Sequence, residues 1–75
     1  MLFFKKRAVK ELDAIIEEMM QYLQNNYKSL AQDARIKLGE RTEQLWQEGK
    51  LTEKEHKKYA AIYKTYTERL ANYHH

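Results

Sequence analysis

The chain has 75 residues, a formal net charge of +3, no cysteine and no proline. This length allows one small core, so residues 1–75 are expected to form a single helical domain, and the missing cysteine excludes disulfides and thiolate metal sites. A charge this mild is weaker than the basic stripe of most nucleic-acid modules, and no apolar run approaches the roughly 18 residues of a membrane span. With only two glycines, the composition favours helices.

Residues 4–24 are expected to form the first helix. Its apolar residues are spaced one, three and four positions apart, which is the pattern of a helical stripe and not the alternation of a strand. The stripe is wide enough to contact two neighbouring helices. It consists of Ala8, Val9, Leu12, Ile15, Ile16, Met19, Met20 and Leu23.

The pair Asn25-Asn26 predicts the first break in the chain, because asparagine tolerates turns and left-handed backbone. Ser29 and Gln32 have the spacing of a capping box, which would start a second helix directly after Ser29. The competing interpretation is one uninterrupted helix from residue 4 to 48, since nothing in this stretch forbids helical backbone.

The second helix, expected over residues 30–48, has a face of mainly small side chains, so neighbouring helices can approach it closely. Gly39 lies in the middle of this helix and costs about 1 kcal/mol relative to alanine. Three interpretations stay open for it: a kink, a close contact with a neighbouring helix, or a tolerated surface glycine. The shared face comprises Leu30, Ala31, Ala34, Leu38, Thr42 and Leu45.

The stretch from Gly49 to Glu55 predicts the sharpest reversal of the chain. Gly49 can take the left-handed conformation that often ends a helix. Thr52, followed three positions later by Glu55, has the spacing of a capping box for the next helix. The pattern Glu-Gly-Lys-Leu-Thr-x-x-Glu is similar to the turns of helical hairpins in several small bacterial proteins, and this resemblance implies the turn but no function.

The third helix is expected over residues 53–73, and tyrosines dominate one of its faces. They follow alternating steps of four and three residues, the spacing of a helix packed along a seam. Each buried phenol needs a hydrogen-bond partner, so two interpretations are open: tyrosines at the rim of the core, or a protein-binding face. The seam comprises Tyr59, Tyr63, Tyr66, Leu70 and Tyr73, and Ile62 flanks it.

Three helices of similar length with short connections predict an all-α, antiparallel three-helix bundle. The alternative is a long helical hairpin that completes its core by dimerising. The closing His74-His75 pair is typical of a purification-tag remnant and is left out of the fold prediction. The expected core comprises Leu12, Ile15, Ile16, Met19, Leu23, Leu30, Leu38, Leu45, Tyr63 and Leu70.

The sequence contains no recognisable catalytic or metal-binding constellation. Outside the terminal pair, His56 is the only histidine, and together with Glu53 it offers two metal ligands where a site needs at least a third. Phosphate-binding loops and nucleophile motifs are missing as well. We therefore expect no enzymatic activity, no cofactor and no metal.

The remaining functional signals are apolar and aromatic surfaces. The N-terminal phenylalanines precede the basic run Lys5 to Arg7. Three interpretations of this segment are open: the phenylalanines pack onto the bundle, they bind a partner, or the segment contacts an anionic membrane. We expect a non-catalytic, cytoplasmic interaction module that forms a homodimer or binds a protein partner. The alternative is a basic peripheral module that contacts nucleic acid or an anionic membrane surface. The candidate interaction surface is Phe3, Phe4, Tyr59, Ile62, Tyr63, Tyr66 and Tyr73.

Overall fold

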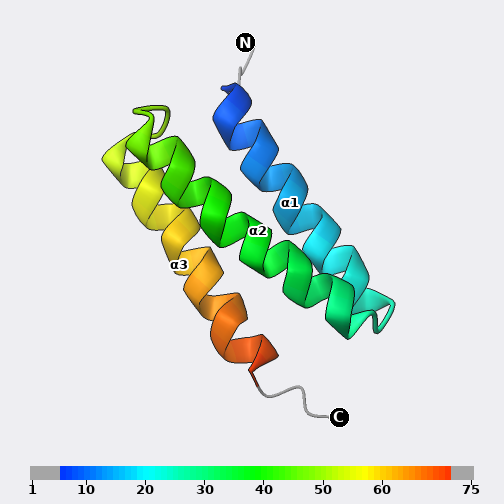
Figure 1. The fold of residues 1–75 in the computed structure, drawn as a ribbon. Coiled ribbons are helices and arrows are strands. Elements are labelled where there is room, and N and C mark those ends of the chain that lie inside the picture. The colour runs from blue at the N-terminus through cyan, green and yellow to red at the C-terminus, as the bar shows by residue number, and fades with distance from the viewer. Residues whose placement is uncertain (1–5, 72–75) are drawn as a thin grey trace.

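Three helices make up the computed structural model, which describes residues 6–71 (Figure 1). They are α1 (Arg7–Gln24), α2 (Lys28–Gln47) and α3 (Glu53–Leu70), and no strand occurs within residues 6–71. Successive helices run in opposite directions, which confirms the all-α, antiparallel three-helix bundle and rules out a single helix through the first turn. The ends predicted at residues 4 and 73 lie outside the described residues.

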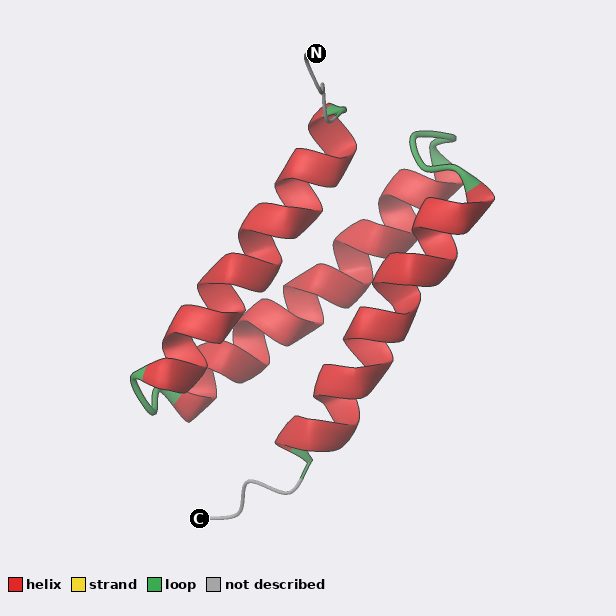
Figure 2. Ribbon diagram, turned by 180° about the vertical axis from the view of Figure 1, so that it is seen from behind, coloured by secondary structure: helices red, strands yellow, loops and turns green. Residues whose placement is uncertain are grey.

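Helix α2 is the central element of the bundle. It packs against both α1 and α3, whereas α1 and α3 approach each other much less closely. Figure 2 shows α1 and α3 on either side of α2. The Cα atoms accordingly span 43 × 26 × 15 Å, so the bundle is flattened. The seam between α1 and α3 is therefore the least closed of the three.

The core forms where the apolar stripes of the three helices meet. Six of the ten predicted core residues are buried, and Ile16, Leu23 and Tyr63 are only partly buried. Thr42 is the one buried polar residue in the part of the chain that the structure describes, and its hydroxyl donates to the Leu38 carbonyl oxygen at 2.7 Å. The confirmed core residues are Leu12, Ile15, Met19, Leu38, Leu45 and Leu70.

The prediction that Leu30 belongs to the core is wrong, because 44% of its surface is exposed. Leu30 precedes Leu38 by eight positions, which rotates it by about 80° around the helix at about 100° per residue. Ala31 lies only about 20° from Leu38 by the same rule and is fully buried. A small residue, Ala31, therefore takes the buried position that was predicted for Leu30.

The chain reverses after α1 through a Schellman turn, which confirms the predicted break. Asn26 adopts φ of 63°, its N–H donates to the Leu23 carbonyl at 3.1 Å, and the Tyr27 N–H donates to the Tyr22 carbonyl at 2.8 Å. The predicted capping box that begins at Ser29 is wrong. Because this turn is so short, Tyr27 becomes the N-cap residue and Ser29 falls inside the first turn of α2.

A second Schellman turn ends α2, and here the predicted chemistry is confirmed. Gly49 adopts φ of 74°, its N–H donates to the Trp46 carbonyl at 3.0 Å, and the Lys50 N–H donates to the Leu45 carbonyl at 2.9 Å. Thr52 then caps α3 through the predicted box: its hydroxyl accepts from the Glu55 N–H at 3.1 Å, and the Glu55 carboxylate accepts from the Thr52 N–H at 2.8 Å.

We expect Gly49→Val to lower the free energy of unfolding by about 1 kcal/mol or more, since valine resists positive φ. A Cβ atom at this position would meet nothing within 4 Å, so the loss would come from backbone strain alone. Gly49→Asn is the matched control, because asparagine tolerates left-handed backbone and should cost less. Urea denaturation measures the free energy of unfolding of both variants. Equal values for the Val and Asn variants would show that backbone strain at positive φ is not the cause of the loss.

Candidate protein-interaction surfaces

The first residue of the predicted tyrosine surface, Tyr59, belongs to the core. Only 1% of it is exposed, and its hydroxyl donates to Asp13 Oδ1 on α1 at 2.6 Å. Burial, followed by the hydrogen bond to the Asp13 carboxylate, raises the pKa of the Tyr59 phenol well above its ordinary value. Tyr59 thus ties α3 to α1 and is not an exposed docking residue. Phe3, Phe4 and Tyr73 lie outside the described residues.

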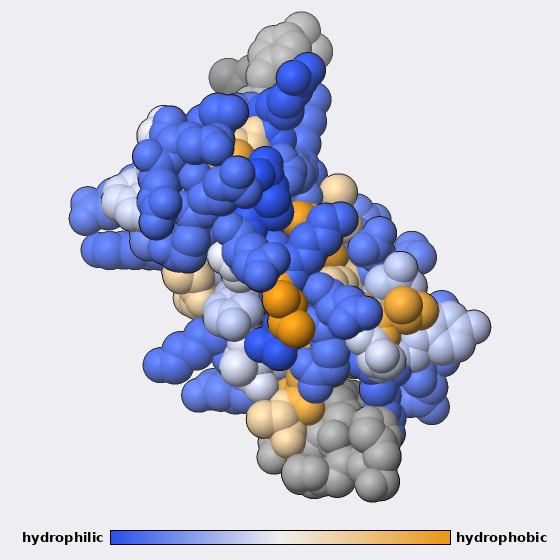
Figure 3. Space-filling view, in the orientation of Figure 1, coloured by the Kyte–Doolittle hydropathy of each residue, from blue (hydrophilic) through white to orange (hydrophobic). Residues whose placement is uncertain are grey.

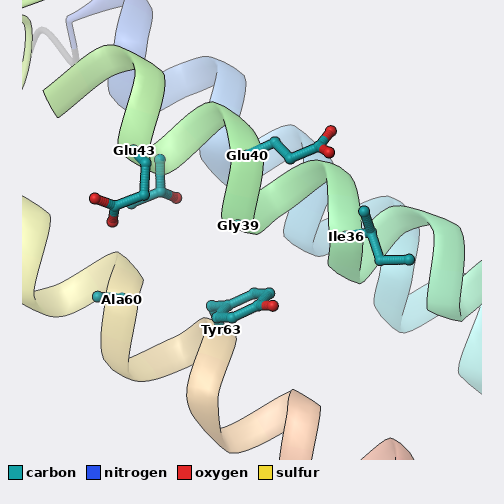
Figure 4. A pocket seen from close by; sticks show the side chains of 7 residues that line it. Ile36, Gly39, Glu40, Glu43, Ala60 and Tyr63 are labelled. Carbon is teal, nitrogen blue, oxygen red and sulfur yellow. The ribbon is translucent and has the colours of Figure 1, made fainter. Parts of the chain in front are cut away.

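Tyr63 lies flat against α2 at Gly39 (Figure 4). A Cβ atom on Gly39 would lie 2.5 Å from Tyr63 Cε1, so no larger residue fits while the ring stays in place. The Tyr63 hydroxyl accepts from Arg35 Nη1 at 3.4 Å, and the same nitrogen donates to Thr67 Oγ1 at 3.0 Å. Of the three interpretations of Gly39, the close contact with a neighbouring helix is the one confirmed.

Gly39→Ala should lower the free energy of unfolding by up to about 2 kcal/mol, because overpacking typically costs about 1–3 kcal/mol and the helix propensity of alanine offsets about 1 kcal/mol. In a Tyr63→Ala background the sign should reverse, and Gly39→Ala should then stabilise the protein by up to about 1 kcal/mol. Chemical denaturation of the four proteins in this cycle measures the effect. If Gly39→Ala instead raises the free energy of unfolding equally in both backgrounds, the Tyr63 ring does not contact Gly39.

The outer side of the α2–α3 seam carries a hollow of about 470 Å³, with Gly39, Thr42 and Tyr63 among its lining residues. Two carboxylates, those of Glu40 and Glu43, lie along its α2 side (Figure 4). Figure 3, which has the orientation of Figure 1, shows a mostly hydrophilic surface with only small apolar patches. The hollow itself is lined largely by apolar side chains, among them Ile36 and Ala60.

His56 on α3 is the one histidine within residues 6–71, and its side chain contacts two residues of α2. Its ring stacks on Trp46 with centroids 4.4 Å apart and an interplanar angle of 2°, and its Nε2 lies 2.8 Å from Glu43 Oε2. Within residues 6–71, no group of three or more His, Cys, Asp or Glu side chains is placed to hold a metal ion.

The seam between α1 and α3 forms a second groove, which we call the α1–α3 groove. It has a volume of about 280 Å³ and is lined by Met20, Leu23 and Gln24 of α1 and by Tyr66 and Arg69 of α3. Met20 is 44% exposed, and Leu23 and Tyr66 are partly buried. The structure thus brings one predicted surface residue, Tyr66, together with two residues that the sequence placed on the core stripe of the first helix.

A third hollow, of about 460 Å³, lies between the start of α1 and the end of α2, and four basic residues line it. Two of them are paired across helices. Arg41 Nη2 donates to Glu11 Oε1 at 2.8 Å, and Lys6 Nζ lies 2.7 Å from Glu55 Oε1. The hydrogen bond from Arg41 holds the pKa of the Glu11 carboxyl below its usual value, and that from Lys6 does the same for Glu55. This basic end therefore contributes to interhelix pairing.

Comparison of the chain with protein-family models, with curated proteins and with solved structures finds no significant match. Among the described residues, no helix is both long enough and apolar enough to cross a membrane.

Proposed function

We propose that this protein is a small, non-catalytic, cytoplasmic interaction module that binds a second copy of itself through the α1–α3 groove. The observation that carries the proposal is the incomplete closure of this seam. Helices α1 and α3 are each packed against α2, yet Met20 keeps 44% of its surface exposed at the seam. The chain contains no cysteine, which is compatible with a reducing compartment.

The size of the chain is the second support for self-association. Small domains bury a smaller fraction of their surface than large ones and are correspondingly marginal in stability. A second copy seated on the groove would cover Met20, Leu23 and Tyr66 and add apolar burial that one chain cannot reach. Because binding to the folded state alone stabilises that state, the dimer would also raise the apparent stability.

Sedimentation equilibrium from micromolar to millimolar concentration tests the proposal. We expect a species with twice the chain mass of 9.1 kDa. Met20→Glu should raise the dissociation constant at least about tenfold, because it places a charge in a groove that the dimer desolvates. A single species of chain mass over the whole range would refute self-association.

Ile36→Glu is the matched control. Ile36 lies beside the α2–α3 hollow and is 45% exposed, nearly the same as Met20, so the substitution introduces the same charge at equal exposure on another face. The dimer should tolerate it. If Ile36→Glu dissociates the dimer and Met20→Glu does not, the interface lies on the α2–α3 side instead.

A further inference from the structure

The hollow of about 470 Å³ on the outer side of the α2–α3 seam, which we call the α2–α3 hollow, combines an apolar lining with an acidic border. Ile36 of α2 and Ala60 and Tyr63 of α3 line it, and the only charged side chains among its lining residues are those of Glu40 and Glu43. Figure 4 shows both carboxylates on α2, across the hollow from the two α3 residues. The border of the hollow is therefore negative.

The apolar wall of the hollow is held in place by contacts within the bundle. The Tyr63 ring lies against Gly39, and its hydroxyl accepts a hydrogen bond from Arg35 Nη1 at 3.4 Å. Thr42, another lining residue, donates its only hydroxyl proton to the Leu38 carbonyl oxygen at 2.7 Å. Sites for small molecules are usually preformed, mainly apolar and about 300–1,000 Å³ in volume, with a few polar groups that fix orientation. The α2–α3 hollow has these properties.

The two border carboxylates differ in what they already contact. Glu43 Oε2 lies 2.8 Å from Nε2 of His56, whose ring stacks on Trp46, so this carboxylate is held beside the hollow. Glu40 forms no hydrogen bond or ion pair with any other of residues 6–71. Because the two residues are three positions apart on one helix, their side chains lie on the same face. A single positive group can therefore contact both carboxylates.

The basic residues nearest to Ala60 in the sequence of α3 do not neutralise this border directly. Lys57 and Lys64 lie about one helical turn before and after Ala60, and neither is a lining residue of the hollow. Lys57 Nζ lies 4.0 Å from a carboxylate of its own helix, that of Glu53. Neither lysine forms an ion pair with Glu40 or Glu43. The two other hollows of the bundle differ, since basic side chains line both of them.

We propose that the α2–α3 hollow binds a small amphiphilic amine. Its apolar part packs against Tyr63 and Ile36, and its ammonium group is bound by Glu40 and Glu43. An ammonium group has three donors and no acceptor, and ionised carboxylates only accept, so the two are complementary. The same border repels an anion of equal shape. The hollow lies on a different face from the α1–α3 groove, so this inference does not depend on self-association.

Hexylamine, compared with hexanol and hexanoate, tests the proposal because the three compounds share one chain length and differ in charge. Two-dimensional NMR of the isotope-labelled protein follows the amide signals of Gly39, Thr42 and Ala60, which line the hollow. The protonated amine should shift these signals saturably at millimolar concentration. It should bind about two- to fivefold more tightly than hexanol, the usual range for a partly exposed charge pair, and hexanoate should bind most weakly. Equal affinities for the three compounds, or shifts that spare these amides, would overturn the proposal.

Glu40→Gln tests the role of the unpaired carboxylate. The substitution keeps the shape of the side chain and removes its charge, so it should weaken binding of the protonated amine about two- to fivefold and leave binding of hexanol unchanged. Glu18→Gln is the matched control, because Glu18 is also exposed in a helix interior but lies on α1. It should change neither affinity. Unchanged amine binding by Glu40→Gln would overturn the assigned charge contact.

Ala60→Leu tests the place of the ligand by filling the hollow. It should weaken binding of hexylamine and of hexanol at least tenfold, because both need the same apolar space. Ala61→Leu is the matched control: Ala61 is the next residue of α3, is exposed and does not line the hollow, so both compounds should still bind. Full binding by a folded Ala60→Leu protein would place the amine elsewhere and overturn the proposal. If circular dichroism shows that Ala60→Leu does not fold, Glu40→Gln decides.

Discussion

Leu38→Ala is expected to lower the free energy of unfolding by about 2–5 kcal/mol, which is enough to leave most molecules of so small a protein unfolded. Leu38 is fully buried at the middle of α2, the helix that contacts both of the others. Truncation removes its apolar contacts and leaves a cavity that the surrounding helices fill only partly. Urea denaturation followed by circular dichroism measures the loss.

Leu30→Ala is the matched control for this change, since it removes the same atoms from the same helix. Leu30 is 44% exposed, so truncation should cost well under 1 kcal/mol if the side chain touches only the surface. The comparison also tests the helical phase of α2. A loss at Leu30 as large as that at Leu38 would mean that Leu30 is covered, either in the core or by a second copy.

Tyr59→Phe is expected to lower the free energy of unfolding by about 1.5–3 kcal/mol near neutral pH, the usual range for a hydrogen bond to a charged group. The substitution keeps the ring and removes only the hydroxyl that donates to Asp13. Tyr66→Phe is the control, because Tyr66 is only partly buried beside the groove. It should change stability by less than about 1 kcal/mol. Comparable losses for both variants would mean that the hydrogen bond to Asp13 adds no measurable stability.

The same hydroxyl predicts a loss of stability in base. The folded state raises the pKa of Tyr59 above the value of about 10 that it has in the unfolded chain. Its contribution is therefore complete below about pH 10 and is lost as the pH rises from there toward the folded-state pKa. Unfolding free energies at a series of pH values should show a smaller alkaline decline for Tyr59→Phe than for the unmodified protein. Equal declines would indicate that groups other than Tyr59, such as the lysines and the remaining tyrosines, control unfolding in base.

The candidate site could be foreseen only in part. The four-and-three spacing of the tyrosines predicted a packed seam, and Tyr66 does lie beside the α1–α3 groove. Spacing on one helix does not reveal which neighbour each position meets, and for this reason the burial of Tyr59 against Asp13 was missed. The exposure of Met20 was missed for the same reason. The breadth of the apolar stripe on the first helix could have indicated the exposure of Met20. A stripe wide enough to contact two helices leaves one edge exposed when one of those helices does not pack closely against it.

The sequence by itself determined the helical class and the second reversal, because helix periodicity, Gly49 and the Thr52–Glu55 box act over a few neighbouring residues. It favoured the first reversal at Asn25-Asn26 but left one continuous helix open, and the structure decided between the two. Only the tertiary structure decided that Gly39 receives the Tyr63 ring and that Ala31, not Leu30, faces the core. It also decided that Met20 and Leu23 of α1 and Tyr66 of α3 line the same groove. These features depend on the rotation and separation of helices that are distant in the chain. Such quantities are set by the packing of side chains from all three helices together, so no local pattern encodes them.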